Sequence, residues 1–108
     1  MPSMKKKLVF VTNPFSGARS KQNLVSLLNQ NIEKDLFDYE LIYTQYPQHA
    51  TQISIDAAAN GVFAVIAVGG DGTINEVAQG LLHTNTALGI LPFGSGNGFS
   101  YHLGFKRD

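Results

Sequence analysis

The chain has 108 residues, a length that suits one domain with its own core and excludes two domains of ordinary size. Eight basic residues balance eight acidic ones, so no overall field favours nucleic acid or an anionic membrane. The absence of cysteine excludes disulfides and thiolate metal sites. The longest apolar run, residues 62–68, is far shorter than the roughly 20 residues that a membrane-spanning helix needs. Because the N-terminus also lacks a long apolar stretch, we expect a cytoplasmic protein.

Apolar runs and helical spacings alternate along the first part of the chain. The sequence predicts a buried strand at residues 8–11 and a helix that begins at Ser20. The apolar face of this helix holds Leu24, Leu27, Leu28 and Ile32. A second strand is expected at residues 39–44, followed by a helix over residues 50–60 that ends at Gly61.

The same alternation continues to the end of the chain. A third strand is predicted at residues 63–68 and a fourth at 88–91, with a short helix near Asn97. The helix between these strands is predicted to bury one face, made of Ile74, Val77, Ala78, Leu81 and Leu82. Strands that alternate with helices indicate a parallel sheet covered on both faces. The loops after the first, third and fourth strands then lie on one rim of the sheet, where such folds bind ligands.

The most informative of these loops is Gly-Gly-Asp-Gly-Thr, residues 69–73. Glycines let a ligand approach the backbone closely, and a helix N-terminus offers unpaired N–H groups to phosphate. Asp71 would repel a phosphate on its own, so its presence indicates an intervening Mg²⁺ ion or water shell. The turn therefore predicts a site for a nucleoside triphosphate.

Other interpretations of the loops stay open on the residues alone. Thr73 and Glu76 have the spacing of a capping box that starts the helix, and Asp71 could stabilise the turn through its own backbone. The loop at residues 13–21 could hold phosphate or be an ordinary turn with the surface cations Arg19 and Lys21. Residues 94–98 could form a second anion-binding turn or a flexible linker. The three histidines lack metal-like spacing, which favours surface or capping roles, and neither a P-loop nor the Rossmann glycine fingerprint is present.

Three motifs in order, together with Thr44, resemble the catalytic domain of the diacylglycerol kinase family. They are Asn-Pro-Phe-Ser-Gly at 13–17, Gly-Gly-Asp-Gly-Thr-Ile-Asn-Glu at 69–76, and Leu-Pro-Phe-Gly-Ser-Gly-Asn at 91–97. The resemblance covers nearly the whole chain and extends more distantly to sphingosine kinases and NAD kinases. It implies an α/β, phosphofructokinase-like (Rossmann-like) three-layer domain with a mainly parallel sheet. Residues 1–108 would be the N-terminal nucleotide-binding domain, truncated before the β-rich C-terminal domain that supplies the catalytic base in the family.

The resemblance also assigns a binding role to particular positions. It implies that ATP with Mg²⁺ binds at three groups of residues: Asn13, Pro14, Phe15, Ser16, Gly17 and Thr44; Gly69, Gly70, Asp71, Gly72, Thr73, Ile74, Asn75 and Glu76; and Ser95, where the family usually has threonine. Asp71 would organise the metal indirectly. Gly98 stands where the family commonly has aspartate, so a role for that acid does not carry over.

The implied function is transfer of the ATP γ-phosphoryl group to a lipid hydroxyl, of diacylglycerol or a similar lipid at the membrane surface, by the full-length protein. The fragment alone is expected to be inactive, and the surface left by the missing domain favours self-association. The alternatives are an NAD-kinase-like enzyme and a non-catalytic nucleotide-binding or interaction domain.

Overall fold

The computed structural model describes residues 5–13, 21–91 and 104–106. Its elements follow in the order β1 (Lys6–Thr12), α1 (Lys21–Asn31), β2 (Phe37–Tyr43), α2 (His49–Ala59), β3 (Ala64–Val68), α3 (Asp71–Leu81), β4 (Ala87–Leu91) and β5 (Gly104–Lys106). The alternation read from the sequence is confirmed through β4. The short helix expected near Asn97 lies outside the described residues.

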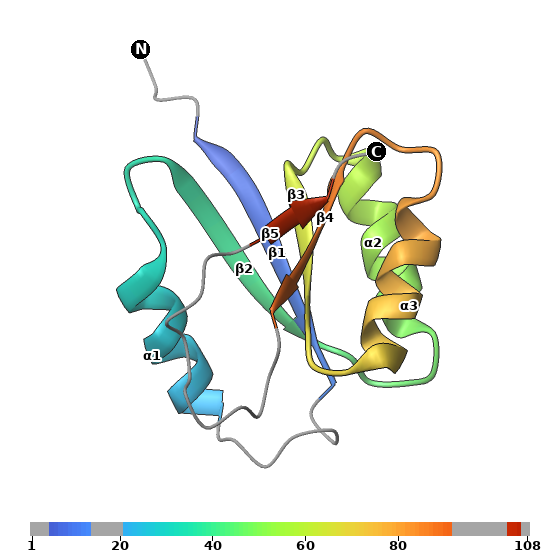
Figure 1. The fold of residues 1–108 in the computed structure, drawn as a ribbon, viewed down its shortest axis with the longest axis horizontal. Helices are drawn as coiled ribbons and strands as arrows, with labels where there is room; N and C mark the ends of the chain where they lie inside the picture. The colour runs from blue at the N-terminus through green and yellow to red at the C-terminus, as the bar shows by residue number, and fades with distance from the viewer. Residues whose placement is uncertain (1–4, 14–20, 92–103, 107–108) are drawn as a thin grey trace.

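The strands form one sheet in the order β2-β1-β3-β4-β5 (Figure 1). The first four strands are parallel, and β5 pairs antiparallel with β4. The chain runs outward from β1 to β2, and in the opposite direction from β3 to β4. The topological switch point therefore lies between β1 and β3, where ligands bind in open α/β sheets.

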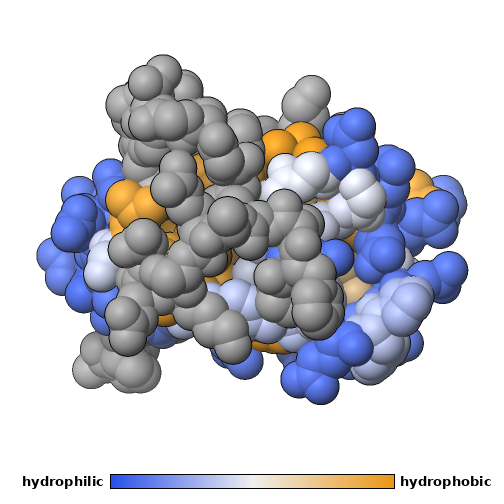
Figure 2. Space-filling view, turned by 90° about the horizontal axis from the view of Figure 1, so that it is seen from below, coloured by the Kyte–Doolittle hydropathy of each residue, from blue (hydrophilic) through white to orange (hydrophobic). Residues whose placement is uncertain are grey.

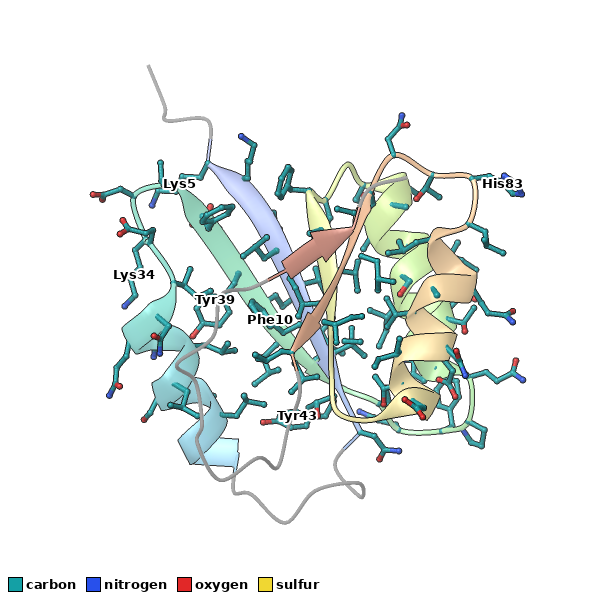
Figure 3. The ribbon with its side chains drawn as sticks, viewed as in Figure 1. Lys5, Phe10, Lys34, Tyr39, Tyr43 and His83 are labelled. Carbon is teal, nitrogen blue, oxygen red and sulfur yellow. The ribbon has the colours of Figure 1, made fainter. Side chains whose placement is uncertain are left out.

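Helices cover both faces of the sheet, which gives the three layers expected (Figure 1). On one face, Leu24 and Leu28 of α1 pack with Phe10 and Ile66. Tyr39 joins this layer, because its ring meets Phe10 edge-on and its hydroxyl donates to Asn29 Oδ1 of α1 at 2.6 Å (Figure 3). These contacts hold α1 over the β2 and β1 side of the sheet.

The other face is covered by α2 and α3, whose residues Ile53 and Val77 pack on Val11 and Ala67. The strands β1 and β3 are buried on both faces, which explains their continuous apolar sequences. The two helices approach closely at Gly80, which is buried against Ser54 of α2. No helix among the described residues is long and apolar enough to cross a membrane.

Two local predictions are wrong, and both concern the ends of α3. The helix begins at Asp71 with Gly70 as its N-cap, so Thr73 lies inside the first turn and the capping box with Glu76 does not form. The helix ends at Leu81, and Leu82 adopts an extended backbone with a side chain that is 63% exposed. Leu82 is therefore not part of the buried face. Gly61, in contrast, follows α2 with φ of 76°, as a helix-ending glycine should.

Candidate functional site

The carboxyl ends of β1, β2, β3 and β4 meet along one rim of the sheet. Thr12 lies level with Tyr43 on one side and Val68 on the other, and Val68 lies level with Leu91. Two hydrogen bonds tie the loops at this rim. The Thr44 N–H donates to the Thr12 carbonyl at 2.9 Å, and the Gly69 N–H donates to the Leu91 carbonyl at 3.3 Å. The rim thus brings together segments that are up to about eighty residues apart in the sequence.

The structure places the predicted residues Asn13, Thr44 and 69–76 at this rim. Asn13 follows β1 directly and is half-buried, whereas Thr44 follows β2 and is buried. Pro14, Phe15, Ser16, Gly17 and Ser95 lie outside the described residues. The rim is the face seen in Figure 2, where hydrophilic residues predominate on the side of α2 and α3.

The N-terminus of α3 has the features of an anion site. Gly70 is the N-cap and makes no side-chain capping bond, since it has no side chain. The first N–H groups of a helix have no partner within the helix and carry a partial positive charge. A Cβ atom added at Gly70 or Gly72 would meet nothing within 4 Å, so the backbone is open to a ligand there. Gly69 has φ of 139°, a conformation that favours glycine and turns the chain from β3 into α3.

The side chains in this segment differ in what they can do. Asp71 and Asn75 are exposed and can reach a ligand at the rim, whereas Thr73 is buried and Ile74 packs partly against the apolar core. Ile74 is therefore placed to anchor the helix, and only its backbone remains near the turn.

Glu76 contacts α2 and the turn before it. Its Oε2 accepts the N–H of Gln48 at 3.3 Å, and its carbonyl accepts the Thr51 hydroxyl at 2.8 Å. Gln48 is the N-cap of α2 and has φ of 70°. Glu76 thus fixes the turn after Thr44 against α3, a contact between residues 28 apart that no local sequence signal predicts.

The turn between β2 and α2 carries an aromatic pair that sequence reasoning treated only as separate residues. Tyr46 stacks on His49 with a centroid distance of 4.2 Å, and His49 Nδ1 accepts the Gln45 N–H at 3.0 Å. His49 is the first residue of α2, and its side chain holds the turn before the helix without capping the helix itself. At the end of β2, burial raises the pKa of the Tyr43 phenol above its ordinary value of 10.0.

Among the described residues of the rim, a magnesium ion would find few protein ligands. The described residues hold no group of three or more histidine, cysteine or acidic side chains that could bind a metal. Asp71 is one exposed carboxylate, which fits the usual situation of Mg²⁺ at a nucleotide, where phosphates and waters supply most ligands.

Comparison with known proteins identifies the family. The model of the diacylglycerol kinase catalytic domain matches residues 7–108. The chain belongs to the diacylglycerol kinase catalytic domain family. It is 33% identical over 105 residues to a diacylglycerol kinase of Bacillus subtilis, covering 95% of this chain and 35% of that protein. It is 35% identical over 101 residues to sphingosine kinase 1 of Caenorhabditis elegans, covering 84% of this chain and 21% of that protein.

The solved structures agree with the assignment to this family. A putative diacylglycerol kinase from Bacillus anthracis superposes with a TM-score of 0.64 and 28% identity, covering 93% of this chain and 37% of that one. The chain therefore spans about a third of the length of these bacterial diacylglycerol kinases. Both the family and the α/β fold predicted from the motifs are confirmed.

Proposed function

We propose that this chain is the nucleotide-binding part of an ATP-dependent lipid kinase. The main support for the proposal is the N-terminus of α3, which has no side-chain cap and an open glycine backbone. It lies at the switch point of a diacylglycerol kinase catalytic domain. The phosphates of ATP would lie against the N–H groups of residues 70–73. Asn13 and Thr44 would contact the nucleotide from the neighbouring strands.

Phosphoryl transfer requires positioning and charge neutralisation more than covalent chemistry. The α3 terminus supplies partial positive charge, and Asp71 would hold Mg²⁺ through water. When bound, the metal would neutralise the phosphate oxygens. The described residues would position the nucleotide. They do not include an identified catalytic base or identified contacts to the acceptor lipid.

The acceptor is proposed from the relatives, which are named diacylglycerol, sphingosine and lipid kinases. The shared feature of the acceptors so named is a lipid hydroxyl. A longer chain with the length of these relatives should phosphorylate diacylglycerol in mixed micelles. Transfer to NAD instead would establish the NAD-kinase-like alternative, and nucleotide binding without any transfer would establish the non-catalytic one.

Nucleotide binding is tested by calorimetric titration of ATP with Mg²⁺ into the 108-residue chain. The Gly72→Ala variant places a methyl group in the open approach to the α3 terminus, so we expect its affinity to fall about tenfold, near 1.4 kcal/mol. The control is Gln79→Ala, an exposed position at the other end of the same helix, which should leave the affinity unchanged. Equal affinities for Gly72→Ala and the parent chain would contradict the proposed site.

A further inference from the structure

Helices α2 and α3 both begin at the rim of the sheet and run side by side away from it (Figure 1). One residue in the second turn of α3, Glu76, contacts the start of α2 twice. Its carboxylate accepts the N–H of Gln48 at 3.3 Å, and its carbonyl accepts the hydroxyl of Thr51 at 2.8 Å. Gln48 is the N-cap of α2, and Thr51 lies in the first turn of that helix. The side chain and the main chain of one residue therefore hold the start of α2 against α3.

The Glu76 carboxylate lies at a helix terminus that has no cap of its own. Gln48 makes no side-chain capping bond to α2. A negative charge near a helix N-terminus is stabilising, because the N–H groups there carry a partial positive charge. α3 likewise has no side-chain cap, since Gly70 is its N-cap. Of these two helix N-termini at the rim, that of α2 thus faces a carboxylate of the protein, whereas that of α3 is the one offered to phosphate.

The same contact fixes the turn that begins at Thr44. At the start of this turn, the Thr44 N–H donates to the Thr12 carbonyl of β1 at 2.9 Å. At its end, Gln48 bonds to Glu76. One end of the turn is therefore fixed to the sheet and the other end to α3. Because Thr44 and the α3 terminus are both proposed to contact the nucleotide, the distance between these two contacts depends on Glu76.

We propose that Glu76 is a positioning residue of the nucleotide site, an inference that rests on the proposed function. It holds residues 44–48 against α3, so that Thr44 and the N–H groups of residues 70–73 meet one nucleotide without rearrangement. Glu76 lies five residues after Asp71, about 7.5 Å further along the helix axis. Its carboxylate is directed to Gln48 and would repel a phosphate. Glu76 therefore acts through the turn and does not touch the nucleotide.

A positioning role predicts a particular pattern of ATP affinities. The apparent affinity is proportional to the fraction of molecules that already have the binding-competent arrangement. Glu76→Ala removes the acceptor of the Gln48 N–H, so we expect its affinity for ATP to fall about fivefold, the lower end of typical couplings between sites. Glu76→Gln keeps an acceptor and should bind ATP as the parent chain does. Because no metal contact is involved, both results should be the same with Mg²⁺ and with EDTA.

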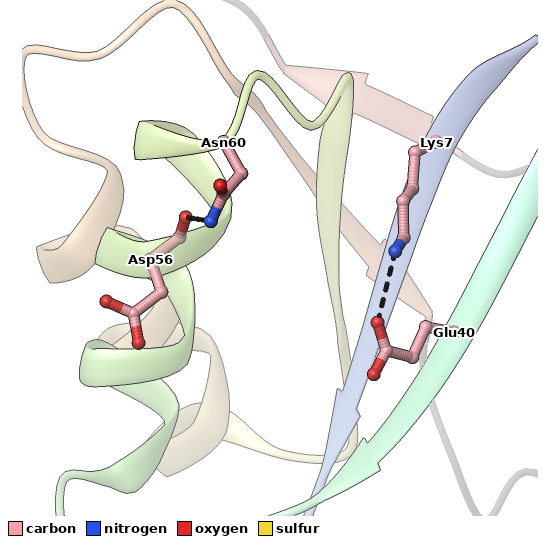
Figure 4. Close-up of polar contacts among 4 residues, drawn as sticks. All are labelled: Lys7, Glu40, Asp56 and Asn60. Atoms are coloured by element: carbon pink, nitrogen blue, oxygen red, sulfur yellow. Dashed lines mark hydrogen bonds and ion pairs between the residues drawn. The ribbon is translucent and has the colours of Figure 1, made fainter.

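The matched control is Glu40→Ala. Glu40 lies on β2, four residues before Thr44, and its Oε1 is 3.3 Å from Lys7 Nζ of β1 (Figure 4). This substitution removes the same side chain and also breaks a contact between two elements, but that contact lies within the sheet and holds no part of the turn. Its affinity for ATP should equal that of the parent chain.

The assay is calorimetric titration of ATP into the 108-residue chain and these variants. Equal affinities of Glu76→Ala and the parent chain would make the contact merely structural and overturn the inference. A loss in Glu76→Gln that appears only with Mg²⁺ would make Glu76 a metal ligand and overturn it as well. A parent chain that does not bind ATP contradicts the proposed function itself, and the inference falls with it.

Hydrogen exchange in the parent chain provides a second measurement that needs no substitution. Coupling between two sites is reciprocal, so a nucleotide that contacts both Thr44 and α3 must also stabilise the bond between Glu76 and Gln48. Saturating ATP should slow exchange of the Gln48 backbone amide several-fold. The amide of Thr84, in the turn after α3, should be unaffected. If ATP binds and leaves the Gln48 exchange unchanged, the inference is overturned, even where Glu76→Ala does not fold.

Discussion

The close approach of α2 and α3 at Gly80 predicts a large loss of stability for Gly80→Ala. A Cβ atom at this position would lie 2.5 Å from the Thr51 carbonyl oxygen and 2.6 Å from Ser54 Cβ, and real Cβ atoms essentially never come within 3.0 Å of a neighbour. Neither neighbour can rotate away, because one is backbone and the other is the first side-chain atom of a helical residue. The two helices must therefore separate.

The size of the effect follows from two opposing contributions. Alanine stabilises a helix by about 1 kcal/mol relative to glycine. Inserting a carbon atom into a packed interior costs about 1–3 kcal/mol, and more where the backbone has to move. Because both contacts here are with atoms that cannot yield, we expect a net loss of about 2 kcal/mol. For a domain of this size, that corresponds to a fall in Tm of about 10 °C.

The assay is equilibrium unfolding in urea, followed by circular dichroism. Gly72→Ala is the matched control, because it adds the same atom to the same helix at a position with nothing within 4 Å. Its free energy of unfolding should be unchanged or higher by up to about 1 kcal/mol. If Gly80→Ala proves as stable as Gly72→Ala, the close packing of α2 on α3 is refuted.

Three further predictions concern the turn after α2, the Glu76 contact and Tyr43. In urea unfolding, Gly61→Ala should lose about 1 kcal/mol of unfolding free energy, because φ of 76° strains residues that have a Cβ atom. Gly61→Asn should lose less. Equal stability of both variants and the parent chain would disprove the strain. Glu76→Ala should accelerate hydrogen exchange of the Gln48 backbone amide, measured by NMR, because it removes the acceptor of that N–H. Glu76→Gln keeps an acceptor and should leave the exchange unchanged. Unchanged exchange in the alanine variant would argue against the hydrogen bond between Gln48 and Glu76. In an ultraviolet titration, Tyr43 should ionise above pH 10.0, and Tyr43→Phe should remove that step. Since the raised pKa favours the neutral phenol in the folded chain, the contribution of Tyr43 to the unfolding free energy should be constant below pH 10.0 and fall as the pH rises through the raised pKa. A difference titration between the parent chain and Tyr43→Phe with its midpoint at or below pH 10.0 would contradict this.

The sequence by itself determined the order of the elements from β1 to β4 and the position of the glycine turn. These features depend on local physics: apolar runs make buried strands, helical spacing makes one-sided helices, and glycines after a buried strand make an open turn. The ends of α3 were predicted less well. Thr73 and Glu76 have the spacing of a capping box, but Gly70 begins the helix because the chain turns at Gly69 with positive φ.

Only the tertiary structure decided which distant residues meet. The strand order put the switch point between β1 and β3. The same packing turned Glu76 toward Gln48 and Thr51 and brought Gly80 against α2. These contacts join residues more than twenty positions apart, and their geometry is set by how the helices pack on a common sheet. Local propensity carries no information about that packing, so a single sequence could not have revealed them.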